Sequence, residues 1–254
     1  MSASSPQATA SELIQATVDV RFVLTGDAGE AEYGELLRKL PPDEQVEASR
    51  YHQTRDRLAF AIGRVLARAT LSLHVPEPAG GWRFERSRYG KPALVRGTDT
   101  SDLRFNIAHC IGAIVVAVSH GQEIGVDIEP LDEVKIDHLE LAREHFAASE
   151  IALLETLPAA QQRKTFLALW TLKEAYLKAR GVGLSEPLSE FSFKLNPPSI
   201  AFSNADANRP EHWFFAQQEL ASSHLLAIAV ERHSAHNILY RLTQMNLAEL
   251  VHSQ

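Results

Sequence analysis

The chain of 254 residues contains one cysteine, Cys110, so no disulfide can form within it. A protein without disulfides fits a reducing compartment. Basic residues are not in excess either, because 25 lysines and arginines face 32 aspartates and glutamates, for a formal net charge of -7. That balance argues against a protein built mainly to coat nucleic acid, although it leaves room for a local basic groove around a small anion.

Long apolar runs are also absent. The longest, from Ile111 to Val118, is far too short to cross a bilayer as a helix. The first dozen residues show neither the basic nor the apolar region of a secretory signal. We therefore expect a cytoplasmic protein with no membrane partner. With 45% hydrophobic residues, the chain can form one large domain or two small ones with packed cores.

Prolines and glycines divide the chain into segments with strand or helix patterns. The expected strands are Val18–Leu24, Ile111–Ser119, Glu123–Glu129, Phe191–Leu195, Ile200–Ser203, His212–Leu220 and Leu225–Glu231. The expected helices are Glu44–His74, Leu139–Leu157 and Ala160–Arg180. A hairpin around Gly121 would join the second and third strands, and the last four strands would form a second sheet. Loops are expected over residues 79–104.

Each half thus contains strands, a long helix and further strands, which predicts an α+β protein of two similar subdomains. We place an N-terminal subdomain at residues 16–122 and a C-terminal subdomain at residues 123–232. Residues 1–15 and 233–254 would be terminal extensions.

An acidic strand, within Glu123–Pro130, carries the first chemical signal. Because side chains alternate along a strand, Asp127 and Glu129 share one face, about 7 Å apart along the strand. Gly125 lies on that face and leaves space beside the backbone. Two carboxylates beside an open spot can hold a hard cation such as Mg²⁺. A half-buried strand with a solvated acidic face explains the same pattern.

A helix with two lysines, within Phe166–Lys178, carries the second signal. Its large apolar side chains form one broad face at about 100° per residue, and Lys173 falls inside that face. An unpaired buried ammonium is strongly disfavoured, so Lys173 must snorkel or meet an anion. Glu174 and Lys178 lie one turn apart, which also suits a surface salt bridge. A phosphate would explain all three residues, because the lysines would contact its oxygens and the glutamate its metal.

Four arginines share one side of the expected first helix: Arg50, Arg57, Arg64 and Arg68. Their spacing keeps them within about 40° of one another around the helix. Guanidinium groups suit phosphate recognition, but the row is too long for one small ligand, so at most two should touch it. A solvated basic face paired with neighbours such as Asp56 is the alternative.

Two single residues complete the candidates. The Tyr89–Pro92 turn projects Lys91. His109 stands just before the apolar strand, where an imidazole could donate a hydrogen bond to a phosphate. A structural histidine with satisfied hydrogen bonds is the more common role for such a residue.

Together these segments resemble the 4'-phosphopantetheinyl transferases, specifically the long single-chain type that activates peptide and polyketide synthases. The matching blocks are Gly90–Pro92, Phe105–His109, Gly125–Glu129, Trp170–Ala179 and Gly181–Leu184. Their order and spacing agree with the family over about residues 50–195. The pairing of G-x-D-x-E with W-x-x-K-E-A-x-x-K is specific, whereas either block alone would be moderate evidence.

The resemblance implies a fold and a reaction. Family members are pseudo-dimers of two α+β halves, each a small antiparallel sheet packed on a long helix, with coenzyme A in the cleft between them. They use Mg²⁺ to move the 4'-phosphopantetheine arm of coenzyme A onto a serine of an apo acyl, peptidyl or polyketide carrier protein, which releases adenosine 3',5'-bisphosphate. Because both halves lie in one chain, a monomer is expected.

The resemblance also implies roles for single residues. The Mg²⁺ ligands would be Asp127, Glu129 and Glu174. The residues in contact with coenzyme A phosphates would be Lys91, His109, Lys173 and Lys178, with Arg50 at the adenosine end. Glu174 by preference, and Glu129 second, would take the serine proton, while Lys178 would help to neutralise charge.

This chain departs from the family at two places. Ala108 stands where members commonly have Ser, which removes one hydroxyl contact to the nucleotide. Glu44 and Glu47 stand near positions where some members have lysines, so recognition of the adenosine end would rest on Arg50 or Arg57. A metal-dependent phosphohydrolase and a noncatalytic coenzyme A-binding protein use similar groups and remain the alternatives.

Overall fold

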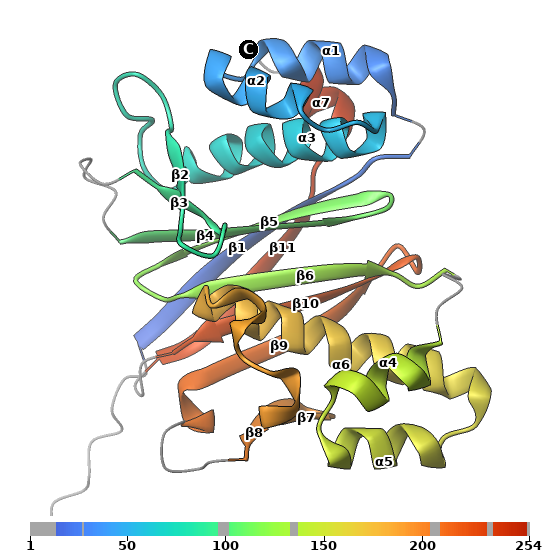
Figure 1. Cartoon of the computed structure of the whole chain (residues 1–254). Helices are drawn as coiled ribbons and strands as arrows, with labels where there is room; N and C mark the ends of the chain where they lie inside the picture. Colours follow the sequence, from blue (N-terminus) through green and yellow to red (C-terminus); the bar gives the residue numbers. More distant parts are fainter. Residues whose placement is uncertain are drawn as a thin grey trace, which may run out of the picture.

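The computed structural model describes residues 14–26, 28–95, 102–132, 137–203, 209–232 and 236–252. Two sheets lie between two groups of helices, which gives the molecule four layers (Figure 1). The helices are α1 Glu30–Arg38, α2 Pro42–Ser49, α3 Thr54–Leu71, α4 His138–His145, α5 Ala148–Thr156, α6 Ala159–Arg180 and α7 Leu247–His252. The strands are β1 Ile14–Leu24, β2 Phe84–Arg86, β3 Pro92–Leu94, β4 Leu103–Cys110, β5 Ala113–His120, β6 Ile124–Pro130, β7 Phe191–Leu195, β8 Pro198–Phe202, β9 Trp213–Leu220, β10 His224–Glu231 and β11 His236–Gln244.

The N-terminal half packs α3 against a four-stranded sheet in the order β11-β1-β5-β4. The pairs β1–β5 and β5–β4 are antiparallel, whereas β11 runs parallel to β1. The apolar stripe of α3, which includes Ile62 and Leu66, shares a core with Ile114 and Val116 of β5. Helices α1, α2 and α7 surround α3 on the outer side of this layer (Figure 1).

The C-terminal half repeats this plan with α6 and an antiparallel sheet in the order β6-β10-β9. Leu172 and Tyr176 of α6 share a core with Ala227 and Ala229 of β10. The predicted α+β class, with two similar halves each built of a small sheet on a long helix, is confirmed.

A third core fills the space between the two sheets. Ile124, Val126 and Ile128 of β6 lie in it together with Val115 and Ala117 of β5. Burial of each such branched side chain contributes roughly 1.5–3 kcal/mol. The predicted alternation along β6 is therefore correct, and it turns the opposite face of the strand, with Asp127 and Glu129, toward α6.

The connection between the halves differs from the predicted hairpin. Gly121 does form a turn, with φ +73°. The strands on its two sides, β5 and β6, nevertheless belong to different sheets. Residues 236–252, which were expected in a terminal extension, form β11 and α7 and so return the chain to the N-terminal half. Residues 1–13 lie outside the described part of the chain.

Two predicted helices are each divided. The helix expected over Glu44–His74 consists of α2 and α3, with extended backbone at Gln53, and Tyr51 at the break packs its ring 5.6 Å from that of Phe60. The helix expected over Leu139–Leu157 consists of α4 and α5. In that second break the backbone extends at Phe146, whose buried ring stacks on Phe166.

Three strand predictions also change. The residues before the apolar strand form a strand of their own, β4, because Gly112 with φ +86° makes a tight turn between β4 and β5. β7 and β8 form a separate two-stranded sheet beside the sheet of β9 and β10. The expected loop region contains the short β2–β3 pair. Within the described residues, no helix is long and apolar enough to cross a membrane.

Candidate active site

Strand β6 and helix α6 bring the acidic and basic candidates together. Gly125 allows a very close approach, because a Cβ atom there would overlap the carbonyl oxygen of Ala175 and the backbone nitrogen of Ala179. The space predicted beside Gly125 is thus taken by the backbone of α6. On the same face of β6, Asp127 Oδ1 accepts a hydrogen bond of 2.5 Å from Lys178 Nζ.

Three carboxyl groups share the space around Lys178, and each has a raised pKa. Burial raises the pKa of Asp127, against the opposing effect of Lys178. Burial first and then the charge of Asp127 raise the pKa of Glu129 to about 7. Burial likewise raises the pKa of Glu174; Lys178 opposes this shift and Asp127 adds to it. Burial thus disfavours the charged form of all three carboxyl groups, and Lys178 opposes this effect at each of them.

Strand β4 of the other half lies across from this cluster. His109, which the sequence placed just before the apolar strand, lies near the end of a strand of its own, β4. Its side chain is exposed, yet the protein atoms around the ring lower its pKa and Lys178 lowers it further, so the imidazole is neutral at pH 7. Burial, with the charges of Glu129 and Asp127, raises the pKa of Cys110 to about 12, which keeps that thiol protonated.

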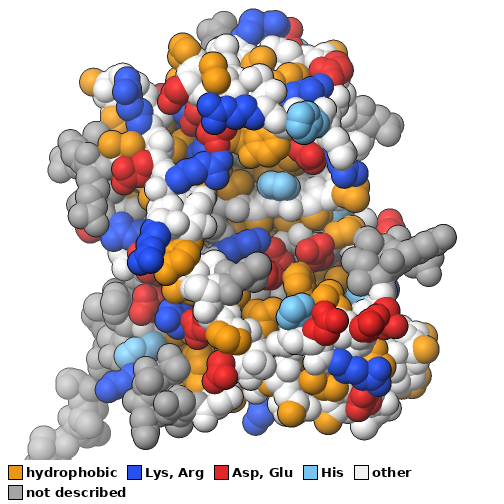
Figure 2. All heavy atoms as spheres, viewed as in Figure 1, with side chains coloured by type: hydrophobic (Ala, Val, Ile, Leu, Met, Phe, Trp, Pro, Cys, Tyr) orange, Lys and Arg blue, Asp and Glu red, His pale blue; other side chains and the backbone are white. Residues whose placement is uncertain are grey.

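A cavity of about 280 Å³ opens between the two halves beside these groups. Glu174 and Lys178 line it from α6, and Lys91 lines it from the turn before β3. Figure 2 shows the surface hollowed between the upper and lower halves, with basic, acidic and histidine side chains along the hollow. The structure thus brings Lys91, Glu174 and Lys178 to one cavity, with Asp127 hydrogen-bonded just behind it.

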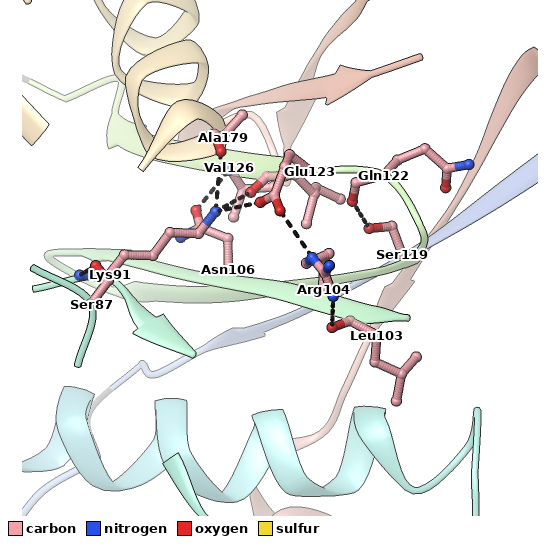
Figure 3. A network of polar contacts seen from close by, with 11 residues as sticks. Ser87, Lys91, Leu103, Arg104, Asn106, Ser119, Gln122, Glu123, Val126 and Ala179 are labelled. Carbon is pink, nitrogen blue, oxygen red and sulfur yellow. Dashed lines mark hydrogen bonds and ion pairs between the residues drawn. The ribbon is translucent and has the colours of Figure 1, made fainter. Parts of the chain in front are cut away.

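Lys91 reaches from the N-terminal half to the backbone of the C-terminal half (Figure 3). Its Nζ donates to the carbonyl oxygens of Ile124 at 3.1 Å and Ala179 at 3.3 Å. The carboxylate of Glu123 lies 3.6 Å from the same nitrogen and accepts a hydrogen bond of 2.9 Å from Arg104 Nε. Lys91 therefore joins the start of β6 to the end of α6, and its contact with a coenzyme A phosphate remains a prediction.

Lys173 does not reach the cavity. Its fully buried Nζ donates to the carbonyl oxygens of Leu188 at 2.7 Å and Phe191 at 2.6 Å, and pairs with Glu150 at 2.7 Å. These three acceptors use all three hydrogens of the ammonium group. The predicted phosphate contact of Lys173 is therefore wrong in this structure. The anion that its apolar surroundings require is the carboxylate of Glu150.

The expected row of arginines is also divided. Arg50 is an exposed residue at the end of α2, so it does not share a helix with the other three. Arg57 Nη2 donates to Glu30 at 2.7 Å and to Thr54 at 2.9 Å. These two contacts of Arg57 are internal to the protein. The binding of the adenosine end of coenzyme A by Arg50 or Arg57 therefore stays a prediction.

The other two arginines account for the acidic residues that depart from the family pattern. Arg68 Nη1 lies 2.9 Å from Glu44 Oε2, and Arg64 Nε lies 3.6 Å from Glu44 Oε1. The second acid, Glu47, pairs with Arg86. Arg64 and Arg68 are thus internal partners of Glu44 rather than phosphate ligands. The alternative of a solvated basic face paired with acids such as Asp56 is correct about the pairing but not about the solvation, because Arg64 is buried.

The three predicted metal ligands, Asp127, Glu129 and Glu174, suit a cation by their chemistry. Mg²⁺ prefers carboxylate oxygens, and a bound cation would favour the charged forms that burial disfavours in these three groups. Asp127 Oδ2 is also buried without a hydrogen-bond partner. In the described part of the chain, however, no three acidic, histidine or cysteine side chains are already arranged around a metal position. The ammonium of Lys178 supplies positive charge at Asp127 instead.

Sequence reasoning missed two buried polar residues near the site. Glu150 is 2% exposed, and nothing in its local pattern marks it as the partner of Lys173. Asn106 Oδ1 accepts a hydrogen bond of 2.9 Å from the backbone nitrogen of Val126 and so joins β4 to β6. An asparagine among apolar strand residues was the available signal for Asn106, because a buried amide requires a partner.

Comparisons with known proteins cover both halves. A model of the 4'-phosphopantetheinyl transferase superfamily matches residues 123–229. A model described as 4'-phosphopantetheinyl transferase, N-terminal, matches residues 27–122.

Two individual relatives carry the same description as these models. The 4'-phosphopantetheinyl transferase HetI of Nostoc sp. is 34% identical over 175 residues, which cover 69% of this chain and 73% of the relative. The 4'-phosphopantetheinyl transferase Sfp of Bacillus subtilis is 32% identical over 157 residues, which cover 62% and 67% of the two chains. The crystal structure of the Thermotoga maritima holo-[acyl-carrier-protein] synthase matches 43% of this chain and 62% of its own, with a TM-score of 0.36 and 20% identity.

Proposed function

This chain belongs to the 4'-phosphopantetheinyl transferase superfamily, and we propose that it transfers the 4'-phosphopantetheine arm of coenzyme A to a serine of an apo carrier protein. The observation that carries the proposal is the position of Glu174 and Lys178. Both line the cavity between the halves, and Lys178 is hydrogen-bonded to the buried Asp127. Basic groups and a carboxylate in one cavity, with a second carboxylate hydrogen-bonded to Lys178, suit a pyrophosphate with its metal.

In the proposed reaction, the serine oxygen of the carrier attacks the phosphorus that bears the pantetheine arm. The bond from that phosphorus to the adenosine bisphosphate breaks, and the bisphosphate leaves with the bonding electron pair. We assign acceptance of the serine proton to the carboxylate of Glu174, because Glu174 lines the cavity. Glu129 is the second choice.

Charge neutralisation and positioning are the main contributions that the protein would make. Lys178 would contact the phosphate oxygens from α6, and Lys91 and His109 from the N-terminal half. A Mg²⁺ ion held by Asp127, Glu129 and Glu174 would, when bound, offset negative charge on the pyrophosphate. Arg50 or Arg57 would hold the phosphate at the adenosine end.

The partners follow from the reaction. Carriers of fatty-acid, polyketide or nonribosomal-peptide synthesis are all acceptable substrates in this proposal. Because the two halves that form the cavity come from one chain, the proposed working form is a monomer. We propose the cytoplasm as its compartment, because a chain with a single cysteine fits a reducing environment. No nucleic acid or membrane takes part in the proposed reaction.

The direct test is incubation of the protein with coenzyme A, Mg²⁺ and a panel of apo carrier proteins, read by intact mass. We expect one carrier of the panel or more to gain the mass of a single phosphopantetheine arm, and a carrier with its serine changed to alanine to gain nothing. Removal of Mg²⁺ with a chelator should stop the transfer. Binding of coenzyme A with no labelled carrier would favour the noncatalytic alternative. Coenzyme A cleavage that needs no carrier would favour a phosphohydrolase.

Two conservative variants test the assigned residues. Glu174→Gln and Asp127→Asn should each lower kcat by about 100-fold or more, because charge stabilisation of this kind is commonly worth that much. Glu155→Gln is the matched control, because Glu155 is an exposed carboxylate that pairs with Arg143 on α4. It should leave the rate unchanged. Near-normal transfer by either site variant would contradict the assigned ligand set.

A further inference from the structure

Two histidines face each other in the N-terminal half, away from the carboxylate cluster. His74 follows the end of α3, and His120 is the last residue of β5. His109, beside the proposed active site, pairs with Ile114 at the opposite end of β5. His120 lies six positions after Ile114, or about 20 Å along the strand. The histidine pair therefore has no part in the proposed transfer reaction.

The geometry of the pair suits two ligands of one metal ion. His74 Nδ1 and His120 Nε2 are 3.2 Å apart, and the ring centres are 5.1 Å apart. Two imidazoles that bind a tetrahedral ion at about 2.05 Å place their nitrogens about 3.3 Å and their ring centres about 5.2 Å apart. A linear hydrogen bond between nitrogens at that separation would place the ring centres about 5.5 Å apart. In the structure the two nitrogens lie within hydrogen-bond distance, and the bend between the rings also fits the arrangement around a shared metal ion.

A buried carboxylate lies on the other side of His74. Asp19 Oδ2 is 3.6 Å from His74 Nε2, and Asp19 is 5% exposed. Neither His74 Nε2 nor Asp19 Oδ1 has a hydrogen-bond partner in the structure. A carboxylate at this position favours a proton on Nε2, which leaves the lone pair of Nδ1 directed toward His120. Metal-binding histidines commonly have such a carboxylate behind them.

We propose that His74 and His120 bind a divalent transition metal ion such as Zn²⁺, with Asp19 orienting the ring of His74. Imidazole suits Zn²⁺, whereas Mg²⁺ prefers oxygen ligands, so the pair selects a different metal from the carboxylate cluster. Because the described residues supply no third ligand, water molecules complete the coordination. The ion ties the end of α3 to β5 and thereby stabilises the N-terminal half.

The test uses the full-length chain without a histidine tag, stripped of metal by a chelator. Zn²⁺ is titrated by calorimetry in excess Mg²⁺, which occupies the carboxylate cluster. We expect one Zn²⁺ to bind per chain and to raise the melting temperature. His120→Ala and His74→Ala should each weaken binding by about 100-fold or more, and Asp19→Asn by about 10-fold, as for second-layer partners of metal ligands.

His145→Ala is the matched control, because His145 is an exposed histidine on α4, and it should bind Zn²⁺ like the unaltered protein. His120 is exposed, so its variant should fold and is the decisive one. Unchanged Zn²⁺ binding in His120→Ala would overturn the proposal, as would a lack of binding by the unaltered chain. Neither result would affect the proposed transferase activity, which is measured separately.

Discussion

The two halves of the molecule share one plan but make their closest helix–sheet contacts in opposite ways. In the N-terminal half the glycine is on the helix: a Cβ at Gly63 of α3 would lie 3.1 Å from Ile107 Cγ2 of β4. In the C-terminal half the glycine is on the strand, and a Cβ at Gly125 would overlap the backbone of α6 at Ala175 and Ala179. One contact is between backbone and a side chain, and the other is between two backbones.

This difference explains why the carboxylates gather in one half. Backbone contact at Gly125 brings the next residues of the same face, Asp127 and Glu129, beside Glu174 and Lys178 of α6. In the N-terminal half the side chain of Ile107 fills the equivalent space between α3 and the sheet. The N-terminal half contributes separate residues, such as Lys91 and Asn106, to the cavity wall rather than a cluster of carboxylates. A repeated fold thus holds an asymmetric site.

The largest expected effect comes from exchanging these glycines for alanine. Gly125→Ala should prevent folding or lower the free energy of unfolding by more than about 4 kcal/mol, because rigid backbone atoms occupy the position of the new methyl group. Gly63→Ala should change it by about 1 kcal/mol or less, because the Ile107 side chain can shift and alanine favours the helix. Urea unfolding followed by circular dichroism measures both. If both variants lowered the free energy of unfolding by the same amount, the distinction between a backbone contact at Gly125 and a side-chain contact at Gly63 would be wrong.

The buried ion pairs give the second comparison. Lys173→Met should lower the free energy of unfolding by about 3 to 5 kcal/mol, because it leaves Glu150 buried without its counter-charge. Glu44→Gln in the N-terminal half should cost less, about 1 to 3 kcal/mol, since Arg64 keeps Glu47 at 3.8 Å.

Adding Glu150→Gln to Lys173→Met should recover part of the stability. This double variant separates the structural role from the phosphate contact that the sequence suggested. A Lys173→Met protein of normal stability, with only its KM for coenzyme A raised, would restore the phosphate role.

Sequence patterns predicted the parts of the fold that depend on local periodicity. The alternation of Ile124, Val126 and Ile128 gave the correct faces of β6, because successive side chains of a strand point to opposite faces. Pro158 and Gly181 marked the ends of α6 to within one residue. Glu174 and Lys178 were found in the same way, since both lie at fixed positions on a helix, whereas Lys91 was found from the turn that contains it.

The remaining features depend on contacts between distant segments. Nothing near Lys173 indicates that Glu150, from another helix, is its partner. The sequence of the short turn at Gly121 does not distinguish a strand that pairs with β5 from a strand that enters a second sheet. The break between α2 and α3 contains neither glycine nor proline, and its extended residue, Gln53, has no local signal.

Removal of the Lys91 side chain, which links the two halves, should have a smaller effect on stability. Lys91→Met should lower the free energy of unfolding by about 1 to 2 kcal/mol, because it removes the hydrogen bonds to Ile124 and Ala179. Hydrogen exchange should increase at the start of β6 and the end of α6 but not in α3. Unchanged exchange at these places, together with a raised KM for coenzyme A, would assign Lys91 to phosphate binding alone.

The smallest expected change in stability distinguishes Arg50 from Arg57. Arg57→Ala should lower the free energy of unfolding only slightly, because it removes the half-exposed pair with Glu30 that supports the start of α3. Arg50→Ala should leave stability unchanged, because Arg50 is exposed at the end of α2.

If Arg50 holds the adenosine-end phosphate, the KM for coenzyme A should rise about 10-fold in Arg50→Ala, as expected for loss of one charged hydrogen bond. Dephospho-coenzyme A, which lacks that phosphate, should show no such rise. A rise in Arg57→Ala instead would place the adenosine end beside α3 of the N-terminal half. Arg57 would then bind a phosphate in addition to its pair with Glu30, whereas an exposed Arg50 gives up no internal contact to do so.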